Sequence, residues 1–201
     1  LRAETLEKYK VKAEKDDKGN IIKHHYPFHN KKGEMVGIKT RLVSNKKFFG
    51  SGDTSKTNAL FGQSLFRPGG KFVTICEGEL DAMAAYELLG SKWPVVSVKN
   101  GAGGAVKDVK ESLEFLESFD CVVINFDNDK VGREAAKKVA RILRPGKSKI
   151  LTLPEEFKDP NDMLRQNNRQ AYVTSWWAAR LYTPSGIINV SDMDDSYFSR
   201  E

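Results

Sequence analysis

The chain has 201 residues, of which 39% are hydrophobic, so it can bury a sizeable core in one domain or in two small ones. It carries 33 Lys and Arg against 27 Asp and Glu, a net charge of +6. No apolar stretch approaches the roughly 20 residues of a membrane span, which excludes a membrane protein. Cys76 and Cys121 lie in apolar runs without a CxxC pair, which excludes a disulfide scaffold and a zinc site. We therefore expect a soluble, cytoplasmic protein, and its start at Leu1 suggests a piece of a longer polypeptide.

The positive charge is concentrated at the start of the chain. Residues 1–70 contain 15 basic and 7 acidic residues, a net charge of +8, whereas residues 71–201 contain 18 and 20, a net charge of −2. A basic first part indicates a polyanionic partner, and an acidic remainder can hold metal ions.

The first part of the chain shows short β-rich runs. Residues 21–22, 25–28 and 35–43 are separated by turn signals at 18–20 and 31–33, which predicts a small antiparallel lobe. The basic residues expected on its exposed faces are Lys39, Arg41, Lys46 and Lys47. A glycine-rich segment over 50–70 predicts the boundary of this lobe, so residues 1–70 are expected to form a basic unit that binds nucleotide or nucleic acid.

After residue 70 the pattern changes to alternating strands and helices. We predict strands over 71–76, 95–98, 121–126 and 149–153, and helices over 80–89, 106–119, 133–143 and 170–181. Such alternation with short connections is typical of an α/β fold, with a mostly parallel sheet flanked by helices over 71–183. Trp176 and Trp177 in the last helix are expected to pack in the core or between lobes. Residues 184–201, with Asp192, Asp194 and Asp195, are expected to be a solvated linker.

Two of the predicted strands end in acidic residues. Glu77 follows the first strand, and Asp127 and Asp129 follow the third. If these strands are neighbours, about 4.8 Å apart, the three carboxylates converge within the span of one or two hard cations. Asp81, one helical turn after Glu77, can reach the same place. An acid after a strand is also a common N-cap of the next helix, and for Asp129 this alternative stays open.

These motifs resemble a known family. Residues 77–81, 127–129 and 158–162 resemble the TOPRIM motifs of primases and topoisomerases. In addition, residues 58–62, residues 95–104 and the overall spacing resemble the RNA-polymerase portion of the primase-helicases of the T-odd phages, from about residue 9 to residue 186. The resemblance implies a DNA primase, which joins ribonucleoside triphosphates into RNA primers on a single-stranded DNA template.

The resemblance also implies roles for individual residues. Glu77, Asp127, Asp129 and Asp159 would bind catalytic Mg²⁺, with Mn²⁺ as a substitute, and Asp81 would assist them. The cations that would hold triphosphate or template are Lys39, Arg41, Lys46 and Lys47. Asp159 is equally compatible with the capped start of a short helix.

A glycine-rich segment after the second predicted strand is a further candidate. The backbone N–H groups of Lys99, Asn100 and Gly101 could cradle a phosphate, or the segment could be only a tight connection. Lys99 departs from the family pattern, in which glycine is usual at this position.

Several partners and alternatives follow. The family fuses a zinc-binding module and a hexameric helicase to this portion, and we expect both on the same polypeptide or on a partner chain.

Residues 146–148 imitate the end of a P-loop, but Arg141 stands where its first glycine should be, and a strand follows them in place of a helix. Another TOPRIM enzyme, such as a nuclease, and a non-catalytic nucleic-acid-binding module remain alternatives. His24, His25 and His29 are expected to be surface or turn residues.

Overall fold

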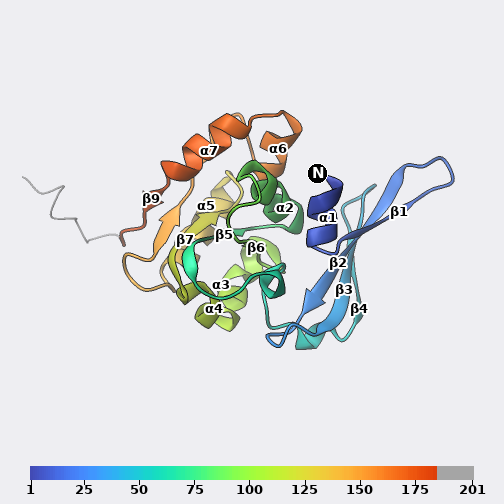
Figure 1. Cartoon of the computed structure of the whole chain (residues 1–201), viewed down its shortest axis with the longest axis horizontal. Coiled ribbons are helices and arrows are strands. Elements are labelled where there is room, and N and C mark those ends of the chain that lie inside the picture. The colour runs from blue at the N-terminus through green and yellow to red at the C-terminus, as the bar shows by residue number, and fades with distance from the viewer. Residues whose placement is uncertain (185–201) are drawn as a thin grey trace, which may run out of the picture.

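The computed structural model describes residues 1–184. The predicted linker after Pro184, with its three aspartates, lies outside these described residues. The chain forms two lobes, each built on its own sheet, and Figure 1 shows the four-stranded lobe beside a larger helix-covered one.

The N-terminal lobe is an antiparallel sheet whose four strands follow the chain order. Its elements are α1 (Ala3–Lys8), β1 (Lys12–Lys15), β2 (Ile21–His29), β3 (Met35–Leu42) and β4 (Phe48–Gly52). The predicted turns are confirmed, because Gly19 and Gly33 take positive φ angles of 83° and 81° there. Helix α1 and strand β4 were not predicted. The glycines of β4 resemble a loop in sequence, but their backbone pairs with β3.

The C-terminal lobe contains a five-stranded sheet in the order β6-β5-β7-β8-β9. The strands are β5 (Gly70–Cys76), β6 (Val95–Ser97), β7 (Phe119–Asn125), β8 (Ser148–Ile150) and β9 (Arg180–Leu181). The first four pair in parallel, and only β9 runs antiparallel. The predicted fold class is therefore confirmed.

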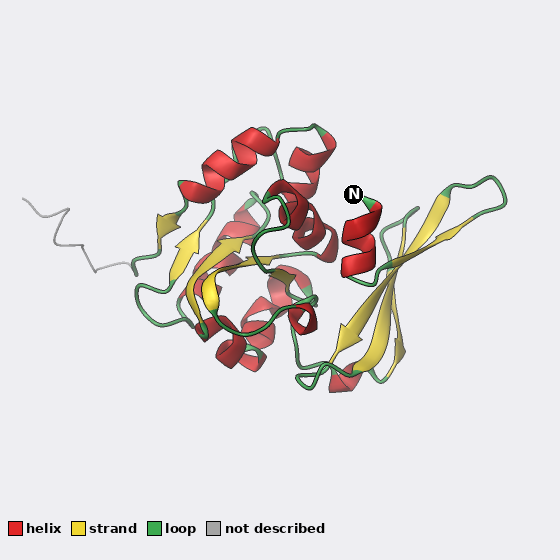
Figure 2. Ribbon diagram, viewed as in Figure 1, coloured by secondary structure: helices red, strands yellow, loops and turns green. Residues whose placement is uncertain are grey.

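Helices cover both faces of this sheet, as Figure 2 shows. They are α2 (Glu79–Leu88), α3 (Gly101–Glu111), α4 (Leu113–Glu117), α5 (Lys130–Ala140), α6 (Pro160–Arg165) and α7 (Arg169–Trp177). Alternating residues of β5 divide between the faces: Val73 and Ile75 pack with α3, α4 and α5, whereas Cys76 packs with α2, α6 and α7. Burial on both faces explains why β5 is almost continuously apolar.

The two lobes share one apolar cluster. Tyr9, Tyr26 and Phe61 are buried together with residues of α2, and the Tyr9 hydroxyl donates to the Val95 carbonyl at 2.7 Å. Phe61 also forms an antiparallel bridge with Ser97, which covers the free edge of β6. The N-terminal sheet therefore packs firmly against the C-terminal lobe. The division at residue 70 into separate functional units stays a prediction.

Some local predictions need correction. The helix expected over 106–119 is two helices, and the first begins five residues earlier, at Gly101. Trp176 is buried, as predicted, and its indole N–H donates to Thr74 Oγ1 at 3.0 Å. Trp177, in contrast, is 58% exposed, with its ring edge against Trp176 and Phe72.

Three smaller expectations concern cysteines, histidines and membranes. Cys76 and Cys121 are free thiols, as predicted. The three histidines lie half-buried in β2 and not in turns. Within residues 1–184, no helix is both long and apolar enough to cross a membrane.

Candidate active site at the interlobe cleft

The C-terminal ends of β5 and β7 bring two predicted carboxylates together. Cys76 and Asn125 are paired in register at the ends of these neighbouring parallel strands, and Glu77 and Asp127 follow them. The Glu77 carboxylate accepts from the Asp127 backbone N–H at 3.4 Å and from the Ala102 N–H at 3.2 Å. Glu77 is thus fixed between the end of β7 and the first turn of α3.

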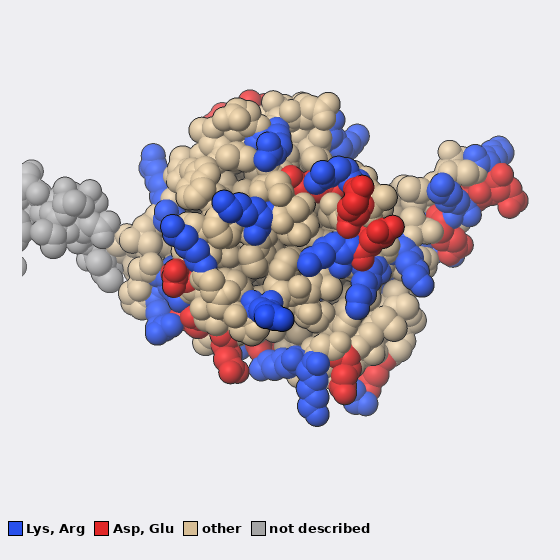
Figure 3. All heavy atoms as spheres, in the orientation of Figure 1, with Lys and Arg blue, Asp and Glu red and all other residues tan. Residues whose placement is uncertain are grey.

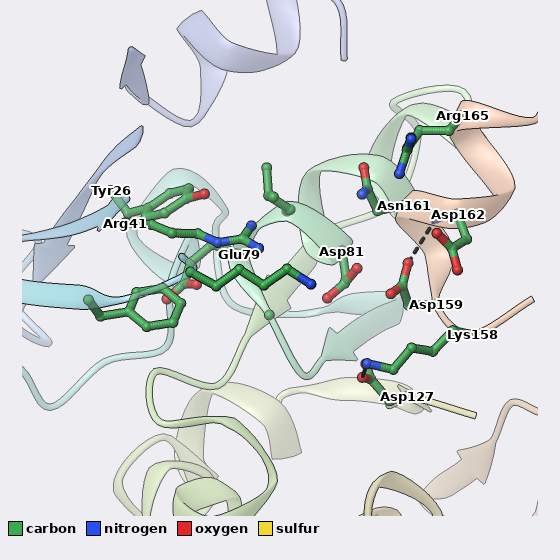
Figure 4. A pocket seen from close by; sticks show the side chains of 14 residues that line it. Tyr26, Arg41, Glu79, Asp81, Asp127, Lys158, Asp159, Asn161, Asp162 and Arg165 are labelled. Carbon is green, nitrogen blue, oxygen red and sulfur yellow. Dashed lines mark hydrogen bonds and ion pairs between the residues drawn. The ribbon is translucent and has the colours of Figure 1, made fainter. Parts of the chain in front are cut away.

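Asp81 lies in the first turn of α2, beside the same strand ends. Gly78 makes its position possible: a Cβ atom at residue 78 would stand 2.7 Å from Asp81 Oδ2. The φ angle of Gly78 is an ordinary −129°, so a glycine is needed here for the close approach of Asp81 and not for an unusual backbone angle. In Figure 4 the Asp81 carboxylate faces that of Asp159.

Asp129 and Asp159 cap helices. Asp129 Oδ1 accepts from the Gly132 N–H at 2.8 Å at the start of α5, and Asp159 Oδ1 accepts from the Asp162 N–H at 2.8 Å at the start of α6. The alternative left open for both residues is therefore real. Each cap uses one carboxylate oxygen, which leaves the other with lone pairs for a further partner.

Asp127 already has a cationic partner. The Lys158 ammonium lies 2.8 Å from Asp127 Oδ2, and this contact raises the pKa of Lys158. The backbone of Lys158 is itself held, because its carbonyl accepts from the Asn128 N–H at 2.7 Å. Asn128 Nδ2 in turn donates to the carbonyls of residues 153, 154 and 157, so it fastens the loop that carries Lys158.

The clustered carboxylates destabilise one another's charge. Burial and the charge of Asp127 raise the pKa of Glu77, and burial with the charges of Asp159 and Asp127 raises that of Asp81. Burial is also the main cause of the raised pKa of Asp159. A hard divalent cation would relieve this repulsion, and oxygen donors are the ligands that it prefers.

Within residues 1–184, no three acidic, histidine or cysteine side chains stand close enough together to enclose a metal ion as they lie. Asp127 is ion-paired with Lys158, and Asp129 and Asp159 each use one carboxylate oxygen to cap a helix. The donor set suits a divalent cation, and the ligand assignment stays a prediction.

The N-terminal lobe contributes cations from the opposite side of the cleft. A cavity of about 540 Å³ lies between Arg41 and Lys46 on this lobe and Asp81, Asp127 and Asp159 on the sheet edge. Figure 4 shows Arg41 on one side and the Lys158–Asp127 pair and Asp159 on the other. A second cavity of about 450 Å³ continues along Glu77, Asn100 and Gly101.

The four predicted lobe cations have different environments. The Lys39 ammonium donates to Glu79 Oε1 at 2.7 Å and to the Lys99 carbonyl at 2.8 Å, so it links the lobes. Arg41 and Lys46 line the first cavity, whereas Lys47 lies exposed just before β4 and outside both cavities. In Figure 3, Lys and Arg side chains are scattered over both lobes, although the net excess lies in residues 1–70.

Lys99 requires a correction. Its side chain is 5% exposed, and its ammonium donates to the Thr57 carbonyl at 2.8 Å and to Glu111 Oε2 at 2.9 Å. Its backbone N–H donates to Asp108 Oδ2 at 2.7 Å. Lys99 thus links Thr57 to α3, and its side chain is not free to bind a nucleotide.

The glycine-rich segment is mostly helix. Asn100 precedes α3, and Gly101 begins it with a φ of 60°. The N–H of Ala102, in the first turn of α3, donates to the Glu77 carboxylate. The Asn100 side chain donates to Asp108 at 3.1 Å. Asn100 and Gly101 line the second cavity, and a phosphate role for them stays a prediction.

Sequence reasoning missed Glu79 and Lys158. Glu79 is 5% exposed and ion-paired with Lys39, and burial raises its pKa. The sequence did contain a signal for Glu79. Residues 77–81 include three acids, and Glu79, which lies between the two that were assigned to the site, needed a separate partner. For Lys158 the adjacent Asp159 was noticed, but which strand end the lysine meets depends on the tertiary structure.

The antiparallel lobe, the parallel sheet and the carboxylates at its edge define a TOPRIM-type nucleic-acid enzyme domain. The Toprim-like family matches residues 74–164. The chain is 32% identical over 168 residues to the DNA helicase/primase of Enterobacteria phage T3, which covers 84% of this chain and 29% of that protein. The chain therefore spans less than a third of the length of this relative.

Two solved structures extend the comparison. The primase fragment of the bacteriophage T7 primase-helicase is 32% identical, with a TM-score of 0.75, over 87% of this chain and 70% of that one. A chain from a T7 assembly, in which a lagging-strand DNA polymerase interacts with primase domains of two gp4 subunits bound to an RNA/DNA hybrid and dTTP, is 31% identical. Its TM-score is 0.80, and the match covers 90% of this chain and 89% of that one. The chain belongs to the TOPRIM-type primase family of the phage primase-helicases.

Proposed function

We propose that this chain carries the primer-synthesising activity of its family, the template-directed joining of ribonucleoside triphosphates on single-stranded DNA. One observation carries the proposal: Asp127, at the end of β7, lines a cavity together with Arg41 and Lys46, and Glu77, at the end of the neighbouring strand β5, lines the adjoining cavity with Asp127. Negative and positive groups on opposite walls are what a triphosphate needs, since its phosphates bind cations and its metal ions bind carboxylates.

The residues that would hold Mg²⁺ or Mn²⁺ are Glu77, Asp127, Asp129 and Asp159, with Asp81 in support. When bound, such ions neutralise the charge that develops on phosphoryl oxygens during nucleotidyl transfer. Arg41 and Lys46 attract and orient the triphosphate from the other wall. The N–H groups of Ala102 and Asp127 hold the Glu77 carboxylate in position.

The partners are part of the proposal. Single-stranded DNA is the proposed template and ribonucleoside triphosphates are the proposed substrates. A zinc-binding module and a hexameric helicase are proposed to lie elsewhere on the full polypeptide or on a partner chain. The proposed location is the cytoplasm, that of the host cell if the chain comes from a phage.

The test is template-directed RNA synthesis. The chain is incubated with a single-stranded DNA template carrying an annealed diribonucleotide, labelled ribonucleotides and Mg²⁺, and the products are separated by length. We expect RNA that is complementary to the template and that disappears when the template or the Mg²⁺ is omitted. Degradation of the DNA without RNA synthesis would instead identify a TOPRIM nuclease, and binding without either reaction a non-catalytic module.

A further inference from the structure

Strand β4 begins with two adjacent phenylalanines whose surroundings differ. Phe48 is 50% exposed and Phe49 is 54% exposed. Because side chains alternate along a strand, the two rings lie on opposite faces of the sheet. Phe48 is paired with Arg41 in register and lines both cavities of the cleft, whereas Phe49 is paired with Thr40 and lines neither.

The Phe48 ring lies among the cations of the cleft. The Lys39 ammonium is 4.4 Å from its centroid, and the Arg41 guanidinium carbon is 6.0 Å from it. Lys39 is itself fixed by its bonds to Glu79 and to the Lys99 carbonyl. The cations therefore flank the ring, and Phe48 is still half exposed and lines the cleft.

An aromatic ring held open in a charged cleft suits a planar ligand. Exposing such a ring to water is unfavourable, and covering it with another flat apolar surface recovers that free energy. Arg41 beside the ring and Lys46, which lines the same cavity, attract phosphate, so the ligand that fits has both a planar ring and phosphates. A nucleotide is that ligand, and the two cavities have the size of small-molecule sites.

We propose that Phe48 is the surface on which the base of the incoming ribonucleoside triphosphate stacks. This inference rests on the proposed function and adds the residue that receives the base. Stacking on an aromatic ring tolerates every base, because every base has a π-face. Phe48 therefore contributes affinity to all four nucleotides, and the choice among them is left to the template.

The experiment measures nucleotide binding without polymerisation. Dissociation constants of ATP, CTP and base-free ribose 5′-triphosphate are determined by calorimetry with the whole chain in Mg²⁺ and without template. The variants are Phe48→Ala, Phe48→Leu, which keeps apolar volume, and Phe48→Trp, which keeps an aromatic surface. Phe49→Ala is the matched control, since it removes the same ring from the opposite face.

We expect Phe48→Ala and Phe48→Leu to weaken ATP and CTP binding roughly tenfold or more, as is typical for the loss of one stacked base. Phe48→Trp should bind as tightly as the unaltered chain, and Phe49→Ala should change nothing. Binding of ribose 5′-triphosphate should be the same in all of them. Thermal melting of each variant shows that it is folded, and should Phe48→Ala unfold, the Leu and Trp variants decide the question.

Other outcomes would overturn the inference. An equal loss for ATP and for ribose 5′-triphosphate would mean that Phe48 only positions Lys39 and Arg41. Weaker binding of single-stranded DNA with unchanged ATP binding would assign the ring to the template. No ATP binding by the unaltered chain at millimolar concentration would also contradict it. Because no RNA is made in this experiment, its failure leaves the proposed synthesis standing, and failure of synthesis leaves these binding results readable.

Discussion

The acidic edge of the parallel sheet and the cations of the antiparallel lobe line two adjoining cavities, but the fold positions their side chains differently. Glu77 and Asp127 come together because two parallel strands end at the same edge in register. On the lobe, Lys39, Arg41 and Lys46 carry the same charge but make different contacts. Lys39 forms an ion pair with Glu79 of the other lobe, whereas Arg41 and Lys46 line the cleft. Strand topology thus sets the positions of the acids, whereas packing between the lobes decides which of the cations is ion-paired and which line the cleft.

The largest effect should come from the acidic edge. Glu77→Gln and Asp127→Asn should each lower the rate of RNA synthesis by roughly 10²-fold or more, because each removes charge from the proposed metal site. Glu77→Gln should melt no lower than the unaltered chain, since the removal of one of several repelling carboxylates relieves that repulsion, whereas Asp127→Asn also loses the ion pair with Lys158 and should melt slightly lower. Product yield on an annealed template and thermal melting measure the two effects. Glu155→Gln, at an exposed acid outside the cleft, is the control, and near-normal synthesis by a folded Glu77→Gln would remove that residue from the site.

The next largest effect concerns Lys99, whose side chain is buried in the folded chain. Lys99→Met should lower the free energy of unfolding by about 3 kcal/mol, because it leaves the buried Asp108 and the Glu111 carboxylate without their cation. Urea denaturation measures this change. Lys107→Met is the matched control: Lys107 also approaches Glu111, at 4.0 Å, but its side chain is 79% exposed, so stability should not change measurably. Equal stability of the two variants would show that Lys99 has no structural role.

The contrast among the lobe cations predicts a difference in salt dependence. Replacing Arg41 and Lys46 together with Gln should make the log–log dependence of single-stranded DNA affinity on salt shallower by about 1.4, at roughly 0.7 for each phosphate contact. Lys39→Gln should leave that slope unchanged, because the Lys39 ammonium already binds Glu79. The measurement is DNA affinity across a salt series. A slope that responds to Lys39 but not to the pair would place the DNA elsewhere.

The smallest effect separates the two roles of Asp129. Asp129→Ala should lower the free energy of unfolding by about 1 kcal/mol, because the N-cap of α5 is lost. Asp129→Asn retains a capping oxygen and should keep the stability, yet it should lose RNA synthesis if the carboxylate also binds metal. Denaturation and synthesis measured on both variants give the answer. An Asn variant with full activity would leave Asp129 with the cap alone.

Much of the site could be predicted because it depends on local patterns. The strand before Glu77 and the strand before Asp127 are each a continuous apolar run that can be recognised in the sequence. Parallel pairing of the two strands then brings their C-terminal ends together. The ambiguity at Asp129 and Asp159 was also visible in advance, since a residue before a helix can cap it and still bind something else. The prediction that Lys99 binds nucleotide was wrong for its side chain, because the glycine-rich segment after it suggested an open loop. Asp108 and Glu111, on the helix that follows, bind this lysine instead.

The sequence by itself determined the alternation of strands and helices, the family motifs and the residues at the strand ends, because hydrophobic period and turn chemistry are encoded over a few residues. The tertiary structure alone decided which cation meets which carboxylate: Lys39 with Glu79, Lys99 with Glu111 and Lys158 with Asp127. It also decided that Phe48 faces the cleft while Phe49 faces away. The three ion pairs join residues 12 to 40 positions apart, and their energies depend on burial that exists only after the chain has folded.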